Sequence, residues 1–290
     1  MTSYEISTML TARDNVTATA AAVHSPYGYV PWESAGVIFA LLFGITTLVH
    51  LVQSFRYGMK FLLPTAVLCG VFEIIGWGAR LYSHFQPHQQ NPYIIQIVTT
   101  IVAPIPLTAA NFIILERIIR KLGPRYSRLS PRNYLRLFLA TDVVAFLIQA
   151  GGGTIAANAT TLSGANQGGN IMLGGIIIQL VFMILFIGLT AEVFYRYNVD
   201  ASIRQPTDEE KLEEVPFLLS DHPRTLVMIE AGAFSTFCLL VRAVYRTIEL
   251  ADGWDGTVIL TQSYFIIFDA LMVTLAMFAI NFFHPGYLLH

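Results

Sequence analysis

Charged residues and cysteines are scarce in this chain. Of its 290 residues 12% are charged and 54% are hydrophobic, whereas a soluble globular protein carries about twice that charged fraction. Both cysteines, Cys69 and Cys238, fall within apolar stretches, which excludes a disulfide scaffold. Because no Cys/His ligand spacing is present either, we predict no metal site and no cofactor.

Motifs for nucleotide binding and for secretion are missing as well. The sequence has no Gly-x-x-x-x-Gly-Lys-Ser/Thr loop and a net charge of −2, so we expect neither a nucleotide nor a nucleic acid as a partner. The first thirty residues lack a basic region followed by an apolar one, so no cleavable signal peptide is expected. Since no two histidines share an apolar helix face, a metal-dependent intramembrane hydrolase is disfavoured and no enzymatic activity is predicted.

Long apolar segments are abundant instead. A helix of about 20 apolar residues crosses a hydrocarbon core of roughly 30 Å. Seven segments qualify, namely Ser34–Phe55, Phe61–Tyr82, Tyr93–Leu115, Tyr134–Ile155, Ile171–Tyr195, Thr225–Ile248 and Val258–Phe283. The stretch Ala157–Asn170, rich in Gly, Asn, Ser and Thr, is predicted to be a loop between the fourth and fifth. We therefore predict an all-α, polytopic membrane protein, a bundle of seven transmembrane helices.

The basic residues predict the orientation. With the N-terminus outside and the C-terminus in the cytoplasm, the three cytoplasmic loops hold 13 of the 17 Lys and Arg residues, as the positive-inside rule requires. The sequons at Asn15 and Asn158 then lie outside and are candidate glycosylation sites. We expect a disordered extracellular segment at 1–28, a membrane domain at 29–286 with a cytoplasmic linker at about 196–223, and a C-terminal tail at 287–290.

Polar residues recur inside four of the predicted spans. They form pairs seven residues apart, which places both members on one side of a helix, two turns from each other. The pairs are Glu73 with Arg80, Asp142 with Gln149, Arg242 with Glu249, and Gln262 with Asp269, and Arg246 and Gln179 can join them. Because a charge at the bilayer centre costs about 2.5–3.5 kcal/mol on insertion scales, we expect these residues to face one bundle interior.

Two interpretations of this interior stay open. The acids and arginines could form ion pairs between helices that fix the bundle, which their similar numbers favour. They could instead line a pathway for a charged lipid headgroup or a proton, in which case all ten residues are substrate-pathway candidates. Pro104 and Pro106 predict a kink or break in the third span, either for packing or to form a binding site as in transporters.

Several of these motifs, taken in order, resemble one family. They are Glu73-x-x-Gly-Trp-x-x-Arg80, Ala103-Pro104 with Ala109-Ala110, Asp142-Val with Gln149 and Gly151-Gly-Gly, Gly175 with Gln179, Phe182 and Phe186, Arg242-Ala-Val-Tyr-Arg246-x-x-Glu249, and Asp269-Ala with His284-Pro-Gly. They are similar to motifs of the fungal lipid-translocating exporter family, from about Tyr29 to Gly286. One difference is Thr261-Gln262, where relatives often have His-Glu, so a proton-linked role does not carry over to position 262.

The resemblance implies a plasma-membrane protein that exports amphipathic lipids and gives resistance to toxic ones. Sphingoid long-chain bases are the best-known substrate class, and sterol analogues and tetrapyrroles are alternatives. The partners expected are membrane lipids, the lipid substrate and, as an open option, further copies of the chain in a homo-oligomer. A seven-helix sensor or receptor with the same topology is the rival. The chain has Glu-Arg-Ile at 116–118 and Asn-Phe-Phe-His at 281–284 in place of the common receptor motifs, which disfavours a receptor without excluding a sensor.

Overall fold

The computed structural model describes residues 25–205 and 223–289, and these form helices without any strand. Seven helical segments in them are long and apolar enough to cross a membrane. They are Glu33–Arg56 (α2), Lys60–Phe85 (η1, η2 and α3), Gln90–Leu122 (α4 and α5), Pro131–Ala157 (α6), Leu162–Asn198 (α7), Pro223–Asp252 (α9) and Gln262–Leu288 (α10, η5, α11 and α12). The predicted all-α class and the number of spans are confirmed.

Three of these segments are composite. The second joins η1 (Lys60–Leu62), the π-helical turn η2 (Leu63–Val67) and α3 (Leu68–Phe85), and the third joins α4 (Gln90–Val102) to α5 (Pro104–Leu122). The seventh joins α10 (Gln262–Phe265), the π-helical turn η5 (Ile266–Ala270), α11 (Leu271–Phe282) and α12 (Pro285–Leu288). A short 3-10 turn, η3 (Pro124–Tyr126), follows α5. The break between α4 and α5 falls at Ala103, and Pro104 and Pro106 lie in the first turn of α5.

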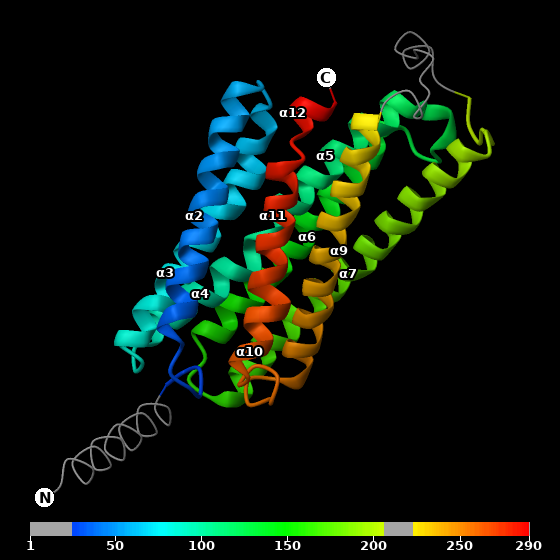
Figure 1. Cartoon of the computed structure of the whole chain (residues 1–290). Helices are drawn as coiled ribbons and strands as arrows, with labels where there is room; N and C mark the ends of the chain where they lie inside the picture. The colour runs from blue at the N-terminus through cyan, green and yellow to red at the C-terminus, as the bar shows by residue number, and fades with distance from the viewer. Residues whose placement is uncertain (1–24, 206–222, 290) are drawn as a thin grey trace, which may run out of the picture.

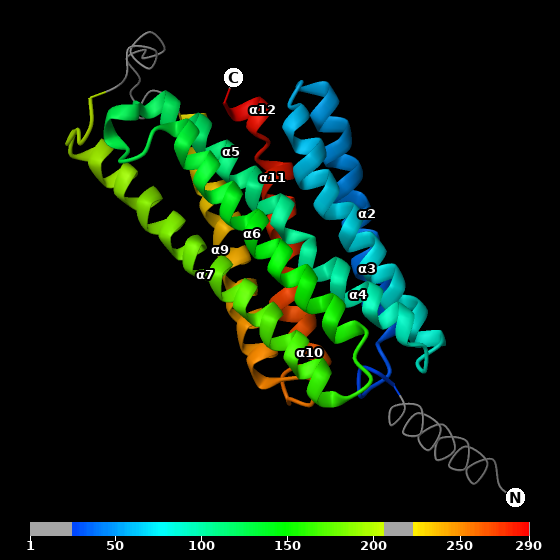
Figure 2. The same ribbon diagram turned by 180° about the vertical axis from the view of Figure 1, so that it is seen from behind.

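The helices form a closed bundle. In Figures 1 and 2, α2 and α3 run together along one side and α7 lies at the opposite edge, with α9 and α11 between them. The third and seventh spans are the most enclosed. We call the end that carries Trp32, Gln89 and Asn158 the outer end, after the predicted orientation, and the end that carries Tyr57 and α12 the inner end.

The α6–α7 hairpin differs from the prediction. Helix α7 begins at Leu162, so most of the expected loop Ala157–Asn170 is helical and only residues 158–161 connect the two helices. Thr161 caps the helix by accepting a hydrogen bond from the Gly164 N–H. A Cβ on Gly168 would lie 2.4 Å from the backbone nitrogen of Ala156, so the two backbones touch. The glycines that indicated a loop are therefore the small residues that a close helix contact requires.

Both ends of the predicted membrane domain are longer than expected. Ser25 and Tyr27 are buried, so residues 25–28 belong to the bundle and not to a disordered segment. Leu288 and Leu289 of the predicted tail are buried too, where α12 packs on α9. The described part of the linker follows Asn198, the end of α7, near the predicted start at about 196. Asn15 and the acidic run at 208–214 lie outside the described residues.

Candidate functional site

Two arginines of α9 and the aspartate of η5 form the centre of a buried ion network. Arg246 donates from Nε and Nη2 to the two carboxylate oxygens of Asp269, at 3.0 and 2.8 Å. Arg242 lies on the same carboxylate, with its Nε 2.8 Å from Oδ1. Asp269 is fully buried. It lies in a π-helical turn, whose backbone hydrogen bonds span one residue more than those of an α-helix. This two-pronged geometry is the one in which a carboxylate holds a guanidinium most firmly.

Further groups of the network come from α9 and from the residues just before the break in the third span. Glu249 accepts hydrogen bonds from Arg246 Nη1 at 2.7 Å and from the Tyr245 hydroxyl at 2.8 Å. Arg242 Nη2 donates to the backbone carbonyl of Thr100 at 2.7 Å. In an unbroken helix this carbonyl would accept from the residue four positions on, which is Pro104 and has no N–H. The proline therefore frees an acceptor for Arg242.

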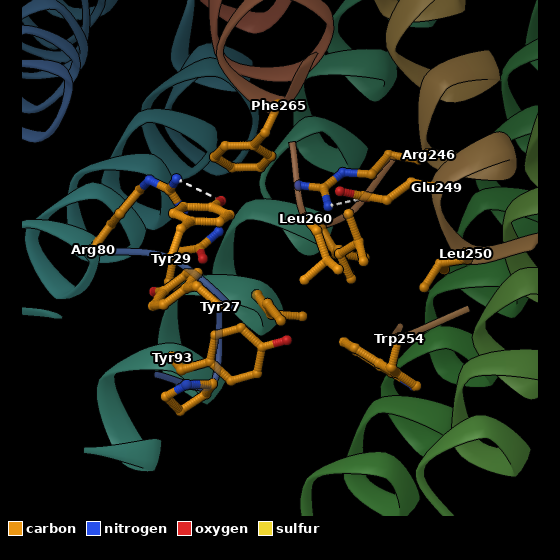
Figure 3. Close-up of a pocket in the computed structure, with 15 residues that line it drawn as sticks. Tyr27, Tyr29, Arg80, Tyr93, Arg246, Glu249, Leu250, Trp254, Leu260 and Phe265 are labelled. Atoms are coloured by element: carbon orange, nitrogen blue, oxygen red, sulfur yellow. Dashed lines mark hydrogen bonds and ion pairs between the residues drawn. The ribbon is translucent and has the colours of Figure 1, made fainter. Parts of the chain in front are cut away.

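Arg80 does not enter an ion pair with any described residue, contrary to the expectation that it balances the interior acids. Its Nη2 donates to the Tyr29 hydroxyl at 2.9 Å (Figure 3). Its guanidinium carbon lies 4.8 to 5.7 Å from the ring centres of Phe265, Tyr27, Tyr29 and Trp77. Rings at that distance stabilise a desolvated cation by about 2 kcal/mol. Burial raises the pKa of the Tyr27 hydroxyl, so this one of the four rings around Arg80 stays neutral at physiological pH.

Glu73 is buried on the same side of α3, two turns further in. It is 1% exposed, and neither carboxylate oxygen has a hydrogen-bond partner among the described residues. Arg242, Arg246 and Asp269 are close enough to act on it electrostatically. Since the two arginines already face two carboxylates, Glu73 adds an uncompensated negative charge when it is ionised.

The remaining candidates are placed apart from these groups. Gln149 donates to Gln179 at 3.2 Å and so joins α6 to α7, while Asp142 on α6 is 3% exposed and forms no ion pair within the described part of the chain. Gln262 accepts from the backbone N–H of Trp32 at the outer end. None of these four lines the pocket of Figure 3. The ten candidates therefore divide among several sites, and the expectation of one shared interior is too simple.

A narrow pocket with charged residues in its lining opens beside the ion network at the outer end. Figure 3 shows Arg80 with Tyr29 on one side of it and Arg246 with Glu249 on the other, with Phe265 between the two pairs. Side chains nearly fill this pocket, which keeps a free volume of about 30 Å³.

A larger cavity of about 370 Å³ lies next to the pocket, between α4 and the α6–α7 hairpin. Tyr93, Ile97 and Trp254 line both spaces and thus form the wall between them. None of the motifs in the sequence includes Tyr27, Tyr93 or Trp254. Their one sequence signal was the clustering of aromatic residues at the outer ends of the spans.

The fold and this site define a polytopic membrane protein that holds charged side chains inside its bundle and has an amphipathic recess at one end. Residues 66–290 match the family described as RTA1-like protein, and the chain belongs to that family. The resemblance seen in the motifs is thereby confirmed.

Three relatives from Saccharomyces cerevisiae illustrate the family. The sphingoid long-chain base transporter RSB1 (strain S288c) is 28% identical over 283 residues, which cover 90% of this chain and 73% of the relative. Protein RTM1 is 25% identical over 289 residues, covering 86% and 88%. Protein RTA1 is 25% identical over 270 residues, covering 84% and 80%. No solved structure matches the chain.

Proposed function

We propose that the protein transports amphipathic lipids, with sphingoid long-chain bases as the favoured substrate class. The observation that carries this proposal is that a pocket lined by Arg80, Arg246 and Glu249 adjoins a larger cavity whose lining residues carry no charge. The two spaces meet at the wall of Tyr93, Ile97 and Trp254. A molecule with a polar head and a hydrocarbon chain can contact both spaces at once. The similarity to a relative named as a long-chain base transporter supports the same class.

The head of a long-chain base is an ammonium group, and it requires a carboxylate. Glu249 is held by Arg246 and Tyr245, whereas both oxygens of Glu73 are without a hydrogen-bond partner among the described residues. Phe265 lines the pocket, and its ring stacks on that of Trp77, 5.6 Å away and one helical turn from Glu73 on α3. In this proposal the head enters the pocket, passes these rings and pairs with Glu73, because an ammonium next to a buried carboxyl favours its ionised form.

The remaining parts of the proposal follow from the sequence. Without a nucleotide-binding loop, movement is downhill or coupled to an ion gradient. The plasma membrane is the proposed location, with the N-terminus outside, and Asn158, exposed between α6 and α7, is the proposed glycosylation site among the described residues. Arg242 and Asp269 serve to hold the network, and Glu73, Arg80, Arg246 and Glu249 face the lipid head.

Reconstitution tests the proposal. Purified protein in liposomes should accelerate the movement of a fluorescent long-chain base between leaflets, measured by quenching of the outer leaflet with and without a pH gradient. Glu73→Gln should lower the accelerated rate about tenfold or more, the effect of about 1.4 kcal/mol on a barrier. Glu192→Gln, in which a carboxylate bonded to Arg128 and Arg196 is changed, is the matched control and should keep the rate.

The proposal fails if correctly folded wild-type protein does not accelerate the movement. Binding of the labelled lipid without movement, together with lipid-dependent recruitment of a second protein, would favour a sensor instead. A rate unchanged in Glu73→Gln would keep lipid transport and remove Glu73 from the pathway.

A further inference from the structure

We infer that the cavity between α4 and the α6–α7 hairpin binds the hydrocarbon chain of the transported lipid, and that Gly153 determines how long a chain it accepts. This inference rests on the proposed function, because it assigns a place to one half of the proposed substrate. The cavity holds about 370 Å³, within the usual size of small-molecule sites of about 300–1,000 Å³.

The lining of the cavity is graded from polar to apolar. Gln90, Thr160 and Thr161 stand at the outer rim, and the inner wall consists of Ile94, Val98 and Met172. A water molecule takes about 30 Å³ of liquid, so the cavity has room for about a dozen groups of that size. Because a methylene is of similar bulk, the space suits a stretch of one alkyl chain.

The position of the cavity explains why an alkyl chain is the occupant. It adjoins the pocket of Figure 3 over Tyr93, Ile97 and Trp254, so a chain within it continues directly into a headgroup that enters that pocket. Trp254 is fixed there, since its indole N–H donates to the carbonyl of Ala165 at 2.9 Å. A rigid aromatic at this point holds the junction between the polar and the apolar part of an amphiphile.

Gly153 provides a way to fill the cavity without disturbing the helices. A Cβ at this position would lie 3.7 Å from the sulfur of Met172 and 3.9 Å from its methyl carbon, both ordinary van der Waals contacts. Gly152 next to it offers no such freedom, because its Cβ would lie 2.6 Å from the backbone nitrogen of Met172. Gly151 is exposed on the outer surface of α6, and its Cβ would meet nothing within 4 Å.

These neighbours form a matched pair of variants. Gly153→Leu adds an isobutyl group to the wall of the cavity, and Gly151→Leu adds the same group, with the same gain in helix propensity, on the surface of the bundle. Gly153→Ala is the milder version, for use if the leucine lowers the yield of folded protein.

The first measurement uses liposomes that contain the protein and fluorescent long-chain bases that differ only in chain length. For Gly153→Leu we expect the ratio of long-chain to short-chain rates to fall about tenfold, the discrimination that one or two methylenes give in an apolar pocket. Gly151→Leu should keep the wild-type ratio. An unchanged ratio in Gly153→Leu, or an equal change in both variants, overturns the inference and leaves lipid transport intact.

The second measurement locates the chain without requiring transport. A long-chain base with a photoreactive group at the end of its alkyl chain is bound to the purified wild-type protein and crosslinked. Labelled peptides from residues 90–98 and 153–172 would support the cavity as the site of the chain. Label confined to the lipid-facing surface of α2 or α6 overturns it, and a positive crosslink with no transport rejects the proposed function alone.

Discussion

At the scale of single residues, the interior depends on one carboxylate that serves two cations. Asp269 holds Arg246 by two hydrogen bonds and lies 2.8 Å from Arg242 as well. Both arginines are also held by Thr100, through its hydroxyl and its carbonyl. The charges of two arginines, Asp269 and Glu249 cancel, which fits the interpretation of the interior as structural ion pairs. Glu73 and Arg80 lie outside this balance, and they fit the pathway interpretation better.

Loss of the shared carboxylate should be costly. Asp269→Asn leaves Arg246 with Glu249 alone and takes from Arg242 its bonded carboxylate, so we expect a loss of about 3–5 kcal/mol in the free energy of unfolding. Thermal unfolding in detergent measures it. Asp200→Asn, at an exposed inner-end pair with Arg125, should cost less than about 1 kcal/mol. Similar melting temperatures for the two variants would contradict a stabilising role for Asp269.

The residue types of this network were predictable, but the partners were not. Spacing by seven residues placed Arg242, Glu249 and Asp269 on the inward faces of their helices, because an ionisable group cannot face lipid. Which arginine meets which acid depends on the π-helical turn around Asp269 and on the carbonyl that Pro104 frees, neither of which has a periodic signal. The aromatic surroundings of Arg80 were not predictable, because its four rings come from three separate segments of the chain: the stretch before α2, α3 and α10.

At the scale of helices, the α6–α7 hairpin and the broken third span position the site. The hairpin packs backbone against backbone at Gly152 and Gly168 and so forms one wall of the cavity. Helix α4 forms the opposite wall, and its end at Val102 directs the Thr100 carbonyl toward α9. Both helices of the hairpin and the break in the third span were predictable from the sequence. The small residues at the start of α7 were instead predicted to form a loop.

Two glycines of α7 test the close contact in the hairpin. Gly168→Ala must push α6 and α7 apart, since the new Cβ would lie 2.4 Å from the Ala156 nitrogen, and overpacking of this kind costs about 1–3 kcal/mol. Gly174→Ala, with nothing within 4 Å of its Cβ, should instead stabilise the helix by about 0.5–1 kcal/mol. Opposite shifts in melting temperature are expected, and shifts of the same sign would contradict the contact.

At the scale of the whole molecule, the larger cavity found among the described residues, about 370 Å³, lies at the outer end. The inner-end pocket between α5, α7 and α9 keeps only about 40 Å³. The described arrangement therefore offers room for a lipid from one side, as one state of a transport cycle would. The number of spans followed from hydropathy alone, because it depends only on length and composition, whereas a cavity depends on how several helices fit together.

The orientation on which the names outer end and inner end depend can be tested directly. Cys69 and Cys238 are buried, so they give little background to a membrane-impermeant maleimide. Ser163→Cys, exposed at the outer end, should be labelled in intact cells, and Asn133→Cys, exposed at the inner end, only after permeabilisation. The reverse pattern would place the N-terminus in the cytoplasm and turn the cavity toward it.

The length of α7 has a consequence for the membrane in which the protein resides. The apolar part of this helix runs from Ile171 to Ala191, roughly 32 Å at 1.5 Å per residue. A bilayer of the endoplasmic reticulum offers a hydrocarbon thickness of about 27 Å and a sterol-rich plasma membrane about 32–33 Å. The mismatch is smaller in the thicker bilayer, where α7 needs less tilt. Hydrophobic thickness alone would thus favour retention of the protein at the cell surface over the membranes through which it passes.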